Sequence, residues 1–157
     1  MSVDARWHRY IYASVAKHLH DIADPIPIDL VVEFLDTRTA SWQSASPRAE
    51  AVITGPMSKE VSKGLHRIWV DVFITLTSDR STNDYVHIGH SGTLANALDQ
   101  CILVRDYGDT GLLDISVLNP IRDDARTVAV QHVTPSEKDE AIHSTIQSRF
   151  YGLFAET

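Results

Sequence analysis

The residues of this sequence whose types and spacing could do chemistry are histidines, above all the pair in His87-Ile88-Gly89-His90. Two imidazoles at the start of a helix could hold the phosphates of a nucleotide, with the helix N-terminus assisting. The same pair could bind zinc if His66 or His132 supplied a third ligand. The other histidines among the eight in the chain are scattered, so satisfied or surface histidines are the simpler interpretation.

The tetrapeptide also matches a nucleotide-binding signature of class I aminoacyl-tRNA synthetases, and Met57-Ser58-Lys59 matches part of their second signature. In those enzymes the first signature follows the first strand of a parallel sheet and the second lies far downstream. Here the order is reversed, and short motifs match by chance. We therefore predict that His87 and His90 neither catalyse a reaction nor bind a metal. A nucleotide-binding enzyme that uses the two histidines is kept as an alternative.

Other catalytic patterns are missing from the sequence. No Gly-x-Ser-x-Gly elbow and no glycine-rich phosphate loop is present. Cys101 is the only cysteine, which excludes an internal disulfide and a thiolate-rich zinc site, and we expect it to be a buried core residue. The aspartates between residues 106 and 124 fit solvated turns. The sequence therefore predicts no enzyme and no cofactor.

Charge limits the classes of partner. The 157 residues contain 14 basic and 21 acidic side chains, a net charge of 14 − 21 = −7, opposite in sign to a dedicated nucleic-acid binder. Residues 37–67 carry five basic and two acidic residues (5 − 2 = +3), whereas residues 85–157 carry five basic and ten acidic residues (5 − 10 = −5). This asymmetry suggests head-to-tail contacts between copies, which can close rings. No apolar stretch approaches the roughly 20 residues of a membrane span, so we expect a soluble protein made in a cytoplasm.

The elements that must position these residues follow from hydrophobic periodicity. Apolar residues at helical spacing predict a helix over residues 3–22, and a second helix is predicted over 91–100. Strands are predicted over 28–35, 49–54, 65–77, 102–105, 112–118, 127–133 and 141–154. Turns rather than crossover helices join neighbouring strands, which indicates a mainly antiparallel sheet. The expected fold is a single α+β domain covering residues 1–157, with the N-terminal helix and the second helix packed on the sheet.

The strand over residues 65–77 is predicted to be central, with one apolar face under the N-terminal helix. The apolar face comprises Ile68, Val70, Val72, Ile74 and Leu76. The opposite face, with Trp69 and Phe73 among charged residues, is expected to be partly exposed or to lie against another subunit. Trp42, in a polar loop over residues 37–48, should either pack back on the core or meet a partner.

This layout resembles the tail terminator, or tail completion, proteins of long-tailed bacteriophages. The resemblance is carried by the leading helix and apolar strand, the hairpin segment 55–64 (Gly-Pro-Met-Ser-Lys-Glu-Val-Ser-Lys-Gly) and the strand segment 68–74 (Ile-Trp-Val-Asp-Val-Phe-Ile). The helix after that strand, the turn at Tyr107-Gly108 and a long last strand with Arg149, Phe150 and Tyr151 also fit. The family has no catalytic signature, so the resemblance lies in the layout of nearly the whole chain.

The resemblance implies a homo-hexameric ring, without cofactor or catalysis, that caps the head-proximal end of the tail tube in the virion. Its partners would be further copies of itself, the tail tube protein and the neck or head–tail connector proteins. Genomic DNA would pass through an acidic lumen without specific binding, and no membrane would be involved. Assembly would take place in the host cytoplasm. Another neck or head–tail joining protein is an alternative that the sequence does not separate.

We predict two assembly surfaces in the loops over residues 37–48 and 57–64. In a simple antiparallel meander, these consecutive loops would lie at opposite ends of the sheet. The candidate contact residues are Arg38, Trp42 and Arg48 in the first loop, and Lys59, Glu60 and Lys63 in the second.

Overall fold

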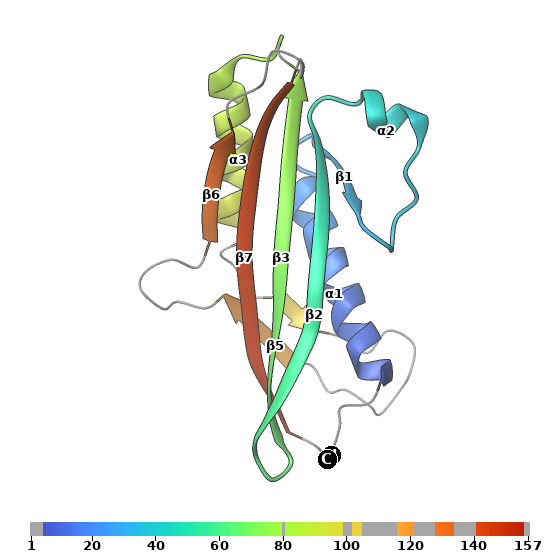
Figure 1. Ribbon diagram of the computed structural model, residues 1–157, viewed down its shortest axis with the longest axis vertical. Helices are drawn as coiled ribbons and strands as arrows, with labels where there is room; N and C mark the ends of the chain where they lie inside the picture. The colour runs from blue at the N-terminus through green and yellow to red at the C-terminus, as the bar shows by residue number, and fades with distance from the viewer. Residues whose placement is uncertain are drawn as a thin grey trace.

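Three strands of 15 residues each run side by side through the whole length of the protein: β2 (Arg48–Ser62), β3 (Leu65–Asp79) and β7 (Ala141–Ala155) (Figure 1). The computed structural model describes residues 5–79, 81–98, 102–104, 116–120, 128–133 and 141–155. The remaining strands are short: β1 (Asp29–Val32), β4 (Ile102–Val104), β5 (Ser116–Pro120) and β6 (Val128–Val133). The helices are α1 (Ala5–Ala23), α2 (Ala40–Ser44) and α3 (Asp84–Leu98).

The strands form one sheet in the order β1-β2-β3-β7-β5-β4, and β6 also pairs with β7. Every described pairing is antiparallel except that of β1 with β2, which is parallel. The chain is therefore a single α+β domain with a mainly antiparallel sheet and a central β3, as the sequence predicted. The simple meander is wrong at its first step. Residues 33–47, which include α2, carry the chain back to the end of the sheet where β1 begins, as a parallel neighbour requires.

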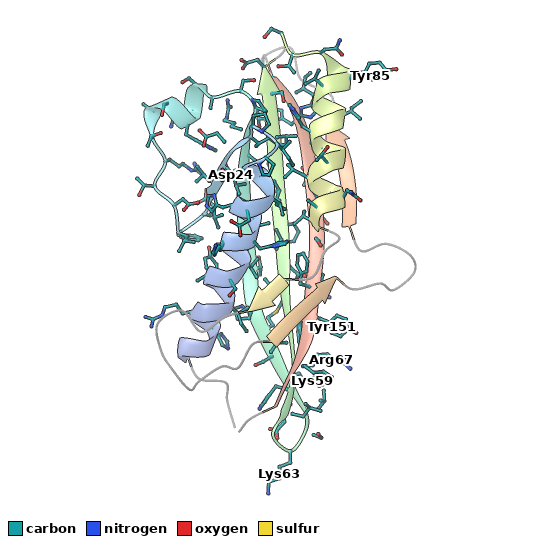
Figure 2. All side chains as sticks on the ribbon, turned by 180° about the vertical axis from the view of Figure 1, so that it is seen from behind. Asp24, Lys59, Lys63, Arg67, Tyr85 and Tyr151 are labelled. Atoms are coloured by element: carbon teal, nitrogen blue, oxygen red, sulfur yellow. The ribbon has the colours of Figure 1, made fainter. Side chains whose placement is uncertain are left out.

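The core lies on one face of the sheet. The predicted apolar face of β3 is at most 1% exposed from Ile68 to Leu76. Helix α1 presents Ile11, Val15 and Leu19 to the same core, because residues three and four apart share one side of a helix. Helices α1 and α3 both lie on this face, as the view from behind shows (Figure 2). The described helices thus leave the opposite face of the three long strands without a helical layer.

Strand β2 corrects two predictions, a short strand ending at Gly55-Pro56 and a linker over residues 57–64. The strand continues to Ser62 through a register shift between Thr54 and Met57, which is a β-bulge. Gly55 has φ +109°, and a Cβ there would lie 3.0 Å from the Met57 nitrogen and 3.1 Å from the Trp69 carbonyl oxygen. Glycine is therefore required by the bulge and does not end the strand. The connection to β3 is only the tight turn at Lys63 and Gly64, with Gly64 at φ +76°.

Helix α3 begins seven residues before the predicted start, despite Gly89 and Gly92. The Asn83 side-chain oxygen accepts the Tyr85 amide at 2.8 Å, and its carbonyl accepts the amides of Val86 and His87. This capping satisfies amides that the first helical turn leaves free.

The predictions for Cys101 and for the turn at Tyr107-Gly108 fall outside the described residues. None of the helices that the structure describes is long and apolar enough to span a membrane.

Candidate assembly surface

The face of β2, β3 and β7 turned away from α1 and α3, here called the open face, is built from side chains that line up across the three strands. The strand registers place three residues in each row, one from each strand. The four lower rows, read from β2 through β3 to β7, are Val52/Phe73/Gln147, Thr54/Asp71/Arg149, Met57/Trp69/Tyr151 and Lys59/Arg67/Leu153. Large apolar side chains are half-exposed here: Val52, Phe73 and Tyr151 at 38% and Leu153 at 55%. Exposed apolar side chains that gather on one face are a feature of interaction surfaces in soluble proteins.

A bidentate ion pair sits in the middle of the open face. Arg149 donates from Nε to Asp71 Oδ1 at 2.5 Å and from Nη2 to Asp71 Oδ2 at 3.0 Å. This hydrogen bond to the carboxylate raises the pKa of Arg149 above its ordinary value. The pair joins β3 to β7 directly across the ladder, and the two charges balance each other within the chain.

The lower end of the open face carries three exposed cations. Lys59, Lys63 and Arg67, here called the cationic end, are exposed on the β2–β3 hairpin, which projects at one end of the molecule (Figures 1 and 2). Within the described part of the chain none of the three forms an ion pair. By contrast, Lys17 pairs with Asp21, and Arg149 pairs with Asp71. The described part of the chain therefore leaves these three charges open to an anionic group.

Glu60 lies between these cations and has a local role. Its carboxylate accepts the Gly64 amide at 3.2 Å, closing the hairpin turn. This hydrogen bond is the largest cause that lowers the pKa of Glu60, since it favours the charged form. Glu60 therefore shapes the turn that presents Lys63.

The other predicted surface, the loop over residues 37–48, is different from expectation. It contains the short helix α2, capped by the Thr39 hydroxyl, which accepts the Trp42 amide at 3.2 Å. Trp42 is only 7% exposed, and its indole Nε1 donates to the Asp29 carbonyl at 3.3 Å. The interpretation that Trp42 packs back on its own domain is confirmed. A bulky ring in a short loop gains more from burial than from exposure, so little of the Trp42 ring is left for a partner to contact. Its assignment as a contact anchor stays a prediction.

The two arginines of that loop are also held within the chain. The guanidinium carbons of Arg38 and Arg48 lie 5.1 and 5.9 Å from the centre of the Trp42 ring, within cation–π range. Arg38 also forms ion pairs with Glu33 and Glu50. Beside them is an open hollow of about 450 Å³. Its lining residues are Trp42, Gln43, Arg48, Glu50, Thr75, Thr77 and His143.

The two candidate loops do lie near opposite ends of the sheet, with α2 near one end and the hairpin turn at the other (Figure 1). The reason is not the predicted meander. Instead, β2 spans the full length of the sheet between them. Of the six candidate residues, the lysines Lys59 and Lys63 combine exposure with unpaired charge.

His87 is enclosed between α3 and the sheet at 1% exposure. Its Nδ1 lies 2.8 Å from the Ser78 hydroxyl and its Nε2 lies 2.7 Å from the Ser144 hydroxyl. Both ring nitrogens are therefore used to fasten α3 to β3 and β7, and neither faces solvent where a phosphate or a zinc ion could bind. Among the residues that the structure places, no three histidine, cysteine or acidic side chains form a group able to hold a metal.

Sequence reasoning missed the combined surface of Trp69, Tyr151, Leu153 and Arg67. Alternation along β3 indicated the exposed face of that strand alone. The neighbours that complete each row come from segments about 80 residues apart in the chain, and only the register brings them together.

Comparison with known proteins gives a fold and no function. No family model matches the sequence, and no curated protein matches it. One solved structure, whose name states no function, is similar with a TM-score of 0.59 at 10% sequence identity, over 95% of this chain and 96% of that chain. At this identity the similarity shows a shared single-domain α+β fold and nothing about activity or partners.

Proposed function

We propose that the protein is a structural virion protein of a tailed bacteriophage. It is a tail terminator that forms a ring at the head-proximal end of the tail, stops growth of the tail tube and joins the tail to the neck. The observation that carries the proposal is the open face, where half-exposed aromatic rows end in the unpaired cations of the cationic end. The resemblance in sequence layout supplies the particular assembly.

A domain with helices on one side of its sheet is well suited to this role. The described core lies between the sheet and the helices α1 and α3, so contacts on the open face need not disturb it. The long β2–β3 hairpin also carries a contact surface away from the core. A ring subunit needs such surfaces for its neighbours and for the proteins above and below the ring. The partners are further copies, the tube protein and the neck proteins.

Net negative charge also agrees with a ring that DNA crosses. A surface of the same sign as the phosphates lets DNA pass without sticking, since nonspecific binding requires cations that neutralise phosphates. An enzyme acting on nucleotides through His87 is less well supported, because that imidazole is enclosed and occupied by two serine hydroxyls.

The test is to determine the mass of the purified protein in solution and to image it by negative stain, alone and with tail tubes. We expect rings of six copies, formed in solution or at one end of each tube, and tubes that stop growing once capped. A monomer that neither caps tubes nor supports head–tail joining in an assembly extract would refute the proposal. Nucleotide turnover by that monomer would favour the enzyme alternative.

A further inference from the structure

Two exposed carboxylates lie in the other half of the molecule from the cationic end. Asp21 and Asp24, here called the acidic patch, are exposed at the C-terminal end of α1, three residues apart and therefore neighbours on its surface. The helix dipole is negative at this end, so carboxylates are unfavourable there and cations are favourable. The basic residue in the last turn is His20, whose Nε2 is already 2.5 Å from Asp36 Oδ2. Asp21 forms an exposed ion pair with Lys17 at 3.6 Å, whereas Asp24 has no ion-pair partner among the described side chains.

The two charged surfaces do not meet within one copy. Figure 2 shows Asp24 in the other half of the molecule from Lys59, Lys63 and Arg67. Each surface also has apolar neighbours that could be buried with it. Leu153 stands in the same row as Arg67, and Pro25 is exposed directly after Asp24.

From this complementarity we infer that the cationic end of one copy docks on the acidic patch of a second copy of the same chain. The inference rests on the proposed function and names the contact that builds its ring. Because the two surfaces differ, the contact is head-to-tail, and repetition closes a ring or extends a filament. In a closed ring, equivalent points of all copies lie at the same height along the ring axis. The cationic end and the acidic patch lie in opposite halves of the molecule, so they can meet only if the long strands are inclined to that axis.

Charge reversal tests the contact from both sides in the full-length chain. One variant, Lys59→Glu/Arg67→Glu, carries negative charge on both surfaces, and another, Asp21→Lys/Asp24→Lys, carries positive charge on both. We expect each variant alone to self-associate at least about tenfold more weakly than the wild type, because like charges then face each other. An equal mixture should regain assembly, with the two variants alternating around an even-numbered ring.

Net charge cannot explain such a rescue. The variants have net charges of −7 − 4 = −11 and −7 + 4 = −3, starting from the charge of the natural chain, so the two still repel each other overall. As a matched control, Thr93→Glu/Asn96→Glu adds two carboxylates at exposed positions of α3 and should assemble like the wild type. Denaturant unfolding curves check that all variants are folded. Raising the salt concentration should weaken self-association of the wild type, because salt screens the charges of the contact.

Sedimentation velocity gives the assembly state, and the same comparison is made at tube ends if the wild type assembles only there. If wild-type rings form but the reversals leave them intact, or the mixture fails to recover, the inference is wrong while the proposed function stands. If the reversed variants still form rings but no longer bind tail tubes, the cationic end contacts the tube protein. If the variants form rings and bind tubes but the rings no longer retain DNA, the cationic end contacts DNA. Either result overturns the inference. A wild type that never assembles removes both proposals.

Discussion

Replacement of His87 by alanine should separate a structural histidine from a nucleotide ligand. The imidazole is buried, and its removal leaves the hydroxyls of Ser78 and Ser144, 1% and 0% exposed, without this partner. Leaving one buried polar group unsatisfied costs about 1–3 kcal/mol. With part of the cavity penalty added, we expect a total loss of about 3–5 kcal/mol in the free energy of unfolding. That is a large share of the roughly 5–15 kcal/mol that stabilises an ordinary domain.

The assay is denaturant unfolding, in which the midpoint should fall while the slope stays unchanged. The matched control is His90→Ala, three residues away in the same tetrapeptide. His90 is only half-buried, and its Nδ1 has no hydrogen-bond partner in the described part of the chain, so its loss should cost less than about 1 kcal/mol. A triple variant, His87→Leu with Ser78→Ala and Ser144→Ala, removes the two hydroxyls that contact the ring together with the ring itself and should recover part of the loss.

Equal costs for the two histidines would refute the argument, as would a His87→Ala protein as stable as the wild type. Saturable ATP binding by the wild type that disappears in a folded His87→Ala variant would show that the ring reaches a ligand, contrary to its enclosed position.

Three further outcomes are expected. Val72→Asp places an unpaired charge at a fully buried position in the middle of β3 and should lower the free energy of unfolding by roughly 3–5 kcal/mol. An unchanged melting temperature would contradict the placement of the core. Burial lowers the pKa of His18 below 6.5, although Asp21 opposes this, so the folded state favours the neutral ring. The resulting stability is present above about pH 6.5 and is lost as the pH falls toward the folded-state pKa. Unfolding free energies at about pH 7.5 and about pH 5.5 should therefore differ less in His18→Gln than in the wild type; an identical difference would refute the assignment. Phe34 has φ +67° and is 95% exposed, so Phe34→Gly should raise stability by up to about 1 kcal/mol in thermal melts, whereas Leu35→Gly, as the control, should not.

Prediction succeeded where the determining interactions are local. The helical spacing of Ile11, Val15 and Leu19 and the alternation along β3 are read within a dozen residues, and each pattern by itself identifies the side that must be buried. The α+β class and the central position of β3 follow from these two elements. The preference of Trp42 for burial over exposure also follows from the size of its ring.

The tertiary structure decided whatever depends on pairing between distant segments. A bulge at Gly55 looks in sequence like the end of a strand, because only the continuation on β3 shows that pairing resumes. The direction of β1 relative to β2 depends on the path of the intervening chain, which local propensity does not specify. The open face exists because the registers align β2, β3 and β7. A shift of one strand by one residue would turn that strand's open-face side chains into the core. The charges of Lys59 and Lys63 are visible in the sequence. Among the residues that the structure places, Lys59 and Lys63 form no ion pair, whereas Arg38 and Arg149 do. This difference is a property of the folded chain alone, because ion pairing depends on distances between side chains that only the fold sets.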